Sequence, residues 1–181
     1  MLFRSPTSAP QEAVYTINYV TNGGTIKGTK ATSYDGKANV PLPKIVKRNY
    51  TFAGWYTDSS YTTKAAVLKQ GSTGNKTFYA KWIKVTKPAK PTISSVKNNK
   101  TKQMTVKVKK VNGAKGYEMV YSTKKNFSSK KKVTFTSTSK KVKSLKKGKT
   151  YYVKVRAYKV DSTNQKVYGN YSKVKKVTIE K

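Results

Sequence analysis

Apolar and polar residues alternate over short segments along most of this chain, and the clearest case runs from Tyr151 to Tyr158. A period of two residues predicts a β-strand with one buried and one solvent-facing side. The predicted inner face carries Tyr151, Val153, Val155 and Ala157, and the outer face carries Tyr152, Lys154, Arg156 and Tyr158. Leu145 and Gly148 precede Tyr151 at intervals of three residues.

The same pattern recurs through the second half of the chain. Turn signals such as Asn112-Gly113 separate the alternating segments. In them we expect Met104, Val106, Val108 and Val142 to face inward, with Thr105, Lys107, Lys109, Lys141 and Lys143 outward. Seven strands are predicted, at 91–96, 103–111, 116–122, 132–138, 140–144, 151–160 and 168–179.

The leucine, glycine and tyrosine before the alternating valines resemble one strand of the fibronectin type III family. The order AKGYEMVYST, LKKGKTYYVKVRAY and VYGNYSKVKKV is similar to its lysine-rich bacterial members. The resemblance implies a seven-stranded immunoglobulin-like β-sandwich. It also implies a tyrosine corner, in which the Tyr151 hydroxyl bonds to upstream backbone. Two tryptophans common in the family are replaced, by Val108 and Tyr171, and the chain has no Arg-Gly-Asp motif.

The first half contains a different set of segments. Residues 14–20 (VYTINYV) alternate into the turn signal Asn22-Gly23-Gly24. Residues 40–43 (VPLP) should be extended, because each proline disfavours helical geometry in the residue before it. Residues 61–69 suit a short helix or an irregular turn. Residues 77–83 predict a closing strand, with Phe78, Ala80 and Trp82 on one face.

The motifs NGGTI, VPLP, YTFAGWYTD and FYAKW resemble the Listeria–Bacteroides repeat, also found as the B repeat of internalin-like surface proteins. The similarity spans Tyr15 to Trp82. It implies a small β-grasp-like fold that serves as a repeated spacer on bacterial surface proteins, with Gly54 and Trp55 as a core and turn signature. Trp55 and Trp82 should supply most of a small core. A sugar-stacking role for Trp55 is the alternative.

These segments divide the chain into a lead-in at 1–12, a repeat domain at 13–84, a linker at 85–90 and a fibronectin type III domain at 91–181. The lead-in has prolines and no periodicity, which predicts disorder. No run approaches the roughly 20 apolar residues of a membrane-spanning helix, and residues 1–10 lack the apolar segment of a signal peptide. We expect a monomeric piece of a longer surface or secreted protein.

Composition argues against catalysis and metal chemistry. The chain has no cysteine, no histidine and six acidic residues, so the usual ligands and acid–base groups are scarce. The candidate carboxylates Glu118, Asp161 and Asp58 are isolated in sequence, and Glu118 is expected on an outer face among lysines. We therefore predict no enzymatic activity, no catalytic residues, no metal and no cofactor.

The charge is extreme, with 40 basic residues against 6 acidic ones. Residues 1–84 carry 12 basic and 3 acidic residues (net +9), and residues 85–181 carry 28 and 3 (net +25), which sum to +34. Lysines are predicted on the outer faces of both sheets, so the positive charge is spread over the surface. Only three of the basic residues are arginines. A specific nucleic-acid site would concentrate charge on one side and favour arginine. A solvated lysine-rich surface without a ligand is the simplest alternative.

Together these features predict a non-catalytic extracellular stalk or spacer of a Gram-positive cell-surface or secreted protein. The expected partners are anionic cell-wall polymers, teichoic acid or peptidoglycan, held by loose electrostatic adhesion. The alternatives are an adhesin or carbohydrate-binding segment with a host or glycan ligand, or accessory modules of a secreted hydrolase. For these alternatives, the predicted ligand surface is Tyr152, Arg156 and Tyr158.

Overall fold

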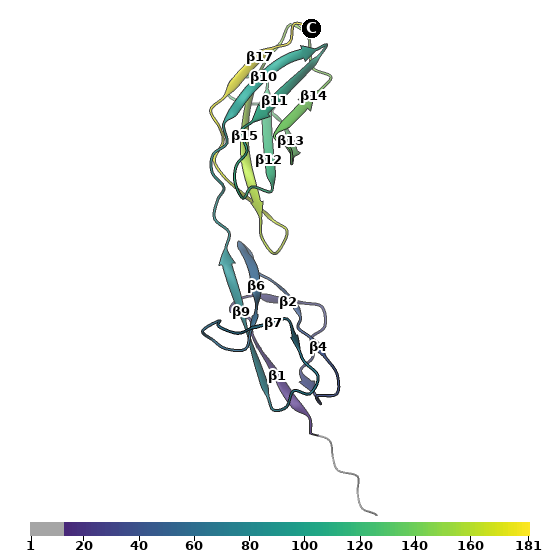
Figure 1. The fold of residues 1–181 in the computed structure, drawn as a ribbon. Coiled ribbons are helices and arrows are strands. Elements are labelled where there is room, and N and C mark those ends of the chain that lie inside the picture. The colour runs from purple at the N-terminus through teal and green to yellow at the C-terminus, as the bar shows by residue number, and fades with distance from the viewer. Residues whose placement is uncertain (1–12) are drawn as a thin grey trace, which may run out of the picture. The chain divides into compact units, whose positions relative to one another are not determined.

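A computed structural model describes residues 13–181, and these contain strands, turns and loops but no α-helix. The chain divides into two compact units, the first ending at Ile83 and the second beginning at Lys84 (Figure 1). The predicted disordered lead-in, 1–12, lies outside the described residues.

The first unit is built on a five-stranded sheet with the order β3-β1-β9-β6-β7. The strands that come first and last in this unit, β1 and β9, pair in parallel, with Tyr19 opposite Phe78. This pair lies inside a mixed sheet, as in a β-grasp-like fold. The sheet strands are β1 (Tyr15–Val20), β3 (Ser33–Tyr34), β6 (Tyr50–Tyr56), β7 (Lys64–Ala65) and β9 (Lys76–Lys84).

Two short ladders complete the first unit. β2 (Thr25–Lys27) pairs with β5 (Lys44–Val46), and β4 (Val40–Pro41) pairs with β8 (Val67–Leu68). Segment 61–69 holds β7 and β8, so it follows the irregular option and not the helical one.

The core of the first unit is largely aromatic. Trp55 is only 3% exposed, and its indole Nε1 donates a hydrogen bond to the Pro43 carbonyl oxygen at 2.9 Å. Tyr19 meets the Trp55 ring edge-on at a centroid distance of 5.3 Å and stacks on Phe78. Edge-on and stacked ring pairs stabilise a core beyond the area they bury, so a few rings suffice for this small unit.

The second unit is a sandwich of two antiparallel sheets (Figure 1). One sheet has the order β10-β11-β14, and the other has the order β13-β12-β15, with β16 and β17 both pairing on the free side of β15. This strand order defines an immunoglobulin-like, fibronectin type III sandwich. The strands are β10 (Ile93–Lys100), β11 (Gln103–Val108), β12 (Gly116–Ser122), β13 (Lys131–Phe135), β14 (Ser139–Val142), β15 (Thr150–Val160), β16 (Lys166–Tyr168) and β17 (Lys175–Thr178).

Its core comes from the inward positions of both sheets. The residues predicted to face inward on β15 are all buried, and Val153, Val155 and Ala157 are fully enclosed. Met104 and Val106 of β11 meet them from the opposite sheet within one apolar cluster. The alternating pattern therefore placed the main face of this core correctly.

The predicted last strand, 168–179, is divided into β16 and β17. Between them the backbone still bonds to β15, since Gly169 and Ser172 donate to the carbonyls of Ala157 (2.9 Å) and Val155 (2.7 Å). The Ser172 hydroxyl also accepts the Val155 N–H at 3.1 Å. A side chain thus replaces a backbone carbonyl of the regular ladder, which interrupts the strand there.

The predicted linker residues form no strand. The Lys159 ammonium donates to the Thr86 hydroxyl at 3.0 Å, and Pro88 is buried. A Cβ on Gly169 would collide with the Pro88 carbonyl oxygen, so only glycine allows this close approach. The chain from Thr86 onward thus packs on the second unit.

Candidate functional site

Three residues of the sequence motif, Leu145, Gly148 and Tyr151, determine the shape of the loop between β14 and β15. Leu145 is buried, and its N–H donates to the Lys102 carbonyl at 2.9 Å. Gly148 has φ of 73°, a left-handed conformation that favours glycine. The Tyr151 hydroxyl accepts the Lys146 backbone N–H at 3.1 Å, which is the hydrogen bond of a tyrosine corner.

The three residues of the predicted ligand surface do not form one exposed strip. Tyr158 is only 7% exposed because its ring lies over Gly116, where a Cβ would be 2.6 Å from the Tyr158 hydroxyl oxygen. Arg156 and Tyr152 are half-buried. The prediction that Tyr158 is exposed is therefore wrong, because β15 is covered on both faces at this point.

Arg156 instead forms an ion pair with Glu118 of the neighbouring strand. Both its Nε and its Nη2 lie 2.8 Å from Glu118 Oε1, and the Tyr171 hydroxyl donates to the same oxygen at 2.8 Å. The guanidinium carbon lies 3.7 Å from the Tyr168 ring centroid and 4.8 Å from that of Tyr171. Glu118 is 6% exposed and its partners are Arg156 and Tyr171, so the expectation that it lies among lysines on an outer face is wrong.

The contacts within this cluster shift the pKa values of Glu118 and Tyr171 in opposite directions. Burial favours the neutral form of Glu118, but the Tyr171 hydrogen bond and the Arg156 charge outweigh burial and lower its pKa. Burial, together with the hydrogen bond to Glu118, raises the pKa of Tyr171 to about 12. Glu118 stays ionised and Tyr171 stays neutral, so neither is suited to exchange protons near neutral pH.

The other two candidate carboxylates hold loops in place. Asp58 accepts backbone N–H groups from Thr62 (3.0 Å) and Thr63 (2.9 Å), which lower its pKa. Asp161 accepts from the N–H groups of Thr163 (2.9 Å) and Gln165 (3.0 Å). Each carboxylate therefore stabilises its own turn.

The tryptophan signature of the first unit is also structural. Trp55 is too deeply buried to stack on a sugar, which contradicts that alternative. Gly54 has φ of 140°, and a Cβ there would collide with the Lys64 side chain. Trp82 donates from its indole to the Thr21 carbonyl at 2.9 Å.

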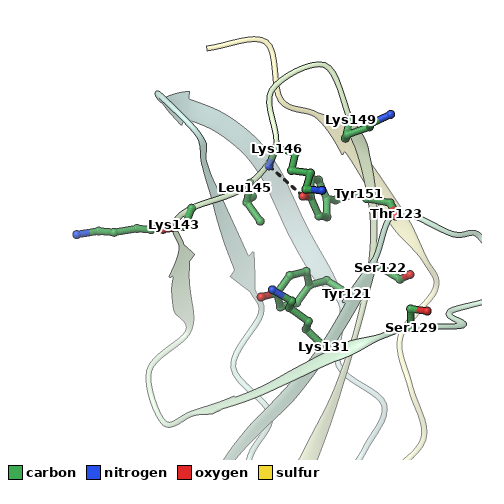
Figure 2. A pocket seen from close by; sticks show the side chains of 11 residues that line it. Tyr121, Ser122, Thr123, Ser129, Lys131, Lys143, Leu145, Lys146, Lys149 and Tyr151 are labelled. Atoms are coloured by element: carbon green, nitrogen blue, oxygen red, sulfur yellow. Dashed lines mark hydrogen bonds between the residues drawn. The ribbon is translucent and has the colours of Figure 1, made fainter.

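A pocket of about 510 Å³ lies at one end of the second unit, between β12, β13 and the β14–β15 loop (Figure 2). Four lysines line it: Lys131, Lys143, Lys146 and Lys149. Six hydroxyl side chains line it as well: Tyr121, Ser122, Thr123, Ser129, Ser144 and Tyr151. Leu145 is the remaining lining residue, so the lining has no carboxylate. Anionic and hydroxyl-bearing groups would find matching partners here.

The sequence analysis did not identify this pocket. The predicted strand at 132–138 begins one residue after Lys131, so this lysine was not placed on the inward face. On β13, Phe135 and Val133 pack into the core, and Lys131 is the next residue on the same face. Lys131 thus continues the inward-facing row of β13 into the lining of the pocket.

Residues 13–181 contain no group of three potential metal-ligating side chains. Across the same range, no helix has the length and apolar character needed to cross a bilayer.

Comparison with known protein families gives a match within the first unit. Residues 15–81 match the family model of the Listeria-Bacteroides repeat domain, so the first unit is a repeat of that family. No curated protein matches the sequence.

Several solved structures are similar to the chain. The FN1–FN3 domains of chicken CNTN1 are 15% identical over 92% of this chain and 69% of that chain, with a TM-score of 0.47. The sixth fibronectin type III domain of human fibronectin type III domain containing protein 3 is 16% identical over 52% of this chain and 88% of that chain, with a TM-score of 0.42. At such scores the fold of the second unit rests on its own strand order.

A repeat of this family followed by a fibronectin type III sandwich is consistent with an extracellular spacer or adhesion-type module. Modules of both kinds are typically non-catalytic. The side chains of the second unit agree with that class, because each of its carboxylate candidates already holds a structural contact.

Proposed function

We propose that this chain is a non-catalytic stalk segment of a Gram-positive cell-surface or secreted protein. It holds other parts of that protein away from the wall and adheres loosely to anionic wall polymers, teichoic acid above all. The proposal rests on the class of the two units and on the net charge of +34.

The observation that carries the adhesive part is the placement of the lysines. Lys107 and Lys141 are exposed on the β10-β11-β14 sheet. Lys132 and Lys176 are exposed on the opposite sheet. Charge on both faces attracts a polyanion from any direction and gives little discrimination among polymers.

The alternative of an adhesin with a ligand platform on β15 has little support. Tyr158 is buried, and Arg156 is engaged by Glu118 and two tyrosine rings. A glycan could not stack there without displacing this cluster.

The test is binding to purified Gram-positive cell walls before and after chemical removal of teichoic acid. At low salt we expect binding to untreated walls and a large loss after the removal. We also expect teichoic acid, heparin and DNA to bind within about tenfold of one another, because counterion release depends mainly on charge density. Absence of low-salt binding to all three polymers would contradict the proposal.

A further inference from the structure

We propose that the lysine-lined pocket is a site for the phosphate group of a polyol-phosphate polymer. The inference rests on the proposed function in one respect, that a wall polymer of this chemistry is the natural source of the ligand. The pocket itself is a localised site on a surface whose other lysines are dispersed.

The lining offers the groups that a phosphodiester needs and none that would repel it. Its four ammonium groups are unopposed by any carboxylate of the lining, and ammonium–phosphate hydrogen bonds are among the stronger ones in proteins. Apart from the Ser122 hydroxyl, which already donates to the Ser128 carbonyl, its hydroxyl side chains can bond either to phosphate oxygens or to the hydroxyls of a polyol chain. This pairing of cations with hydroxyls suits a polymer that carries both phosphate and hydroxyl groups.

Two of the lysines are placed to act directly. Figure 2 shows the Lys131 and Lys146 side chains extending over the pocket beside Tyr121 and Tyr151, whereas Lys143 and Lys149 extend away from it. We therefore assign the primary contacts to Lys131 and Lys146. The outer pair adds long-range attraction.

The two phenols supply donors that the protein does not use. Tyr151 accepts a hydrogen bond from Lys146, which leaves its own proton free to donate. Tyr121 lies beside it, with a ring-centroid distance of 6.2 Å. Within residues 13–181 neither phenol donates to a protein acceptor.

Hydrogen bonds within the protein hold the pocket wall in place. The Ser122 hydroxyl donates to the Ser128 carbonyl at 2.9 Å and accepts the Lys124 N–H at 3.0 Å. The β14–β15 loop is tied to Lys102 by the Leu145 N–H and to Ile179 by the Gly148 N–H (2.7 Å). A preformed wall reduces the ordering cost of binding, which distinguishes this place from lysines on flat sheet faces.

The test uses glycerol phosphate as the probe, with amide chemical shifts of the full chain as the readout. Near 150 mM salt the Debye length is about 8 Å, so dispersed attraction is weak. We expect saturable shifts confined to residues 121–131 and 143–151. The double variant Lys131→Gln/Lys146→Gln should weaken binding by at least about tenfold.

The matched control is Lys107→Gln/Lys109→Gln, which removes the same charge from two exposed lysines outside the pocket. This control should retain affinity within about twofold. Tyr121→Phe keeps the ring and removes one donor, and it should weaken binding about threefold.

Two outcomes would overturn the inference. One is equal loss in the two double variants, and the other is shifts spread over all the lysine surfaces. Either outcome would contradict the pocket site only. The proposed function would still hold if polymers bind at low salt. Failure of low-salt polymer binding together with saturable pocket shifts would have the opposite meaning, a phosphate site on a chain that does not adhere to walls.

Discussion

At the scale of single residues, the Tyr151 hydroxyl matters more than its neighbour on the other face of β15. Tyr151→Phe leaves the Lys146 N–H without its protein partner, and we expect a loss of about 1–2 kcal/mol in the free energy of unfolding of the second unit. Tyr152→Phe should change it by less than about 0.5 kcal/mol. Chemical denaturation of both variants makes the comparison. Equal losses would mean that the Tyr151 hydrogen bond does not stabilise the loop.

The Glu118–Arg156 pair predicts a specific dependence of stability on pH. Because the folded pKa of Glu118 lies below its ordinary value of 4.5, the carboxylate stabilises the fold above that pH. This contribution is lost as the pH falls through the lowered folded pKa. At pH 7, Glu118→Gln should cost about 1–3 kcal/mol, less than a fully buried pair, since the Arg156 side chain is 24% exposed.

The measurement is the free energy of unfolding of wild type and Glu118→Gln between about pH 7 and pH 3. The difference between the two should shrink below pH 4.5. Other carboxylates such as Asp58 cancel in this difference because they are common to both proteins. A difference independent of pH would contradict an ionised, paired Glu118.

Sequence reasoning succeeded at residues whose role is local and failed where partners are distant. Tyr151 bonds only five residues away, and its motif is visible in the sequence. Glu118 is satisfied by Arg156 and Tyr171, which lie 38 and 53 residues further along the chain. Their meeting depends on strand register, which periodicity alone does not determine.

At the scale of elements, the turn after β1 depends on a glycine that the repeat motif contains. A Cβ on Gly24 would collide with the Trp82 ring and lie 2.8 Å from Ile45 Cδ1. Gly24→Ala should therefore destabilise the first unit by about 1–3 kcal/mol through overpacking. The loss should be smaller in a Trp82→Phe background, because the smaller ring leaves room. Thermal unfolding of the four proteins of this cycle measures the coupling, and additive losses would rule out the contact as the cause.

The inner and outer faces were predicted correctly for strand segments that bury one face, and less well for segments that are covered on both faces. The alternation of β15 gave its inner face correctly, but Tyr158 is covered by Tyr168 and Gly116 on the face expected to be wet. The division of the last strand depends on the Ser172 hydroxyl meeting the Val155 N–H. A serine in a lysine-rich strand gives no sign of that contact.

At the scale of the whole molecule, we propose that the two units fold independently. Their cores are separate clusters, one centred on Trp55 and the other on Met104 and Val155. Fragments 13–84 and 85–181 should each unfold cooperatively and give dispersed amide spectra. The second fragment begins at Val85 so that Thr86 and Pro88 keep their contacts with it. An unstructured fragment beside a folded whole chain would contradict this division.

The central claim is that dispersed charge on a non-catalytic stalk attracts wall polymers, and that the second unit supplies most of this attraction. The measurement that tests it most directly is the affinity of the two fragments and of the whole chain for teichoic acid as a function of salt. We predict a steep decline with salt for the whole chain and for the second fragment, whose net charge is +25 against +9 for the first. The first fragment should bind much more weakly at every salt concentration. Equal binding by the two fragments, or an affinity of the whole chain that does not depend on salt, would contradict the claim.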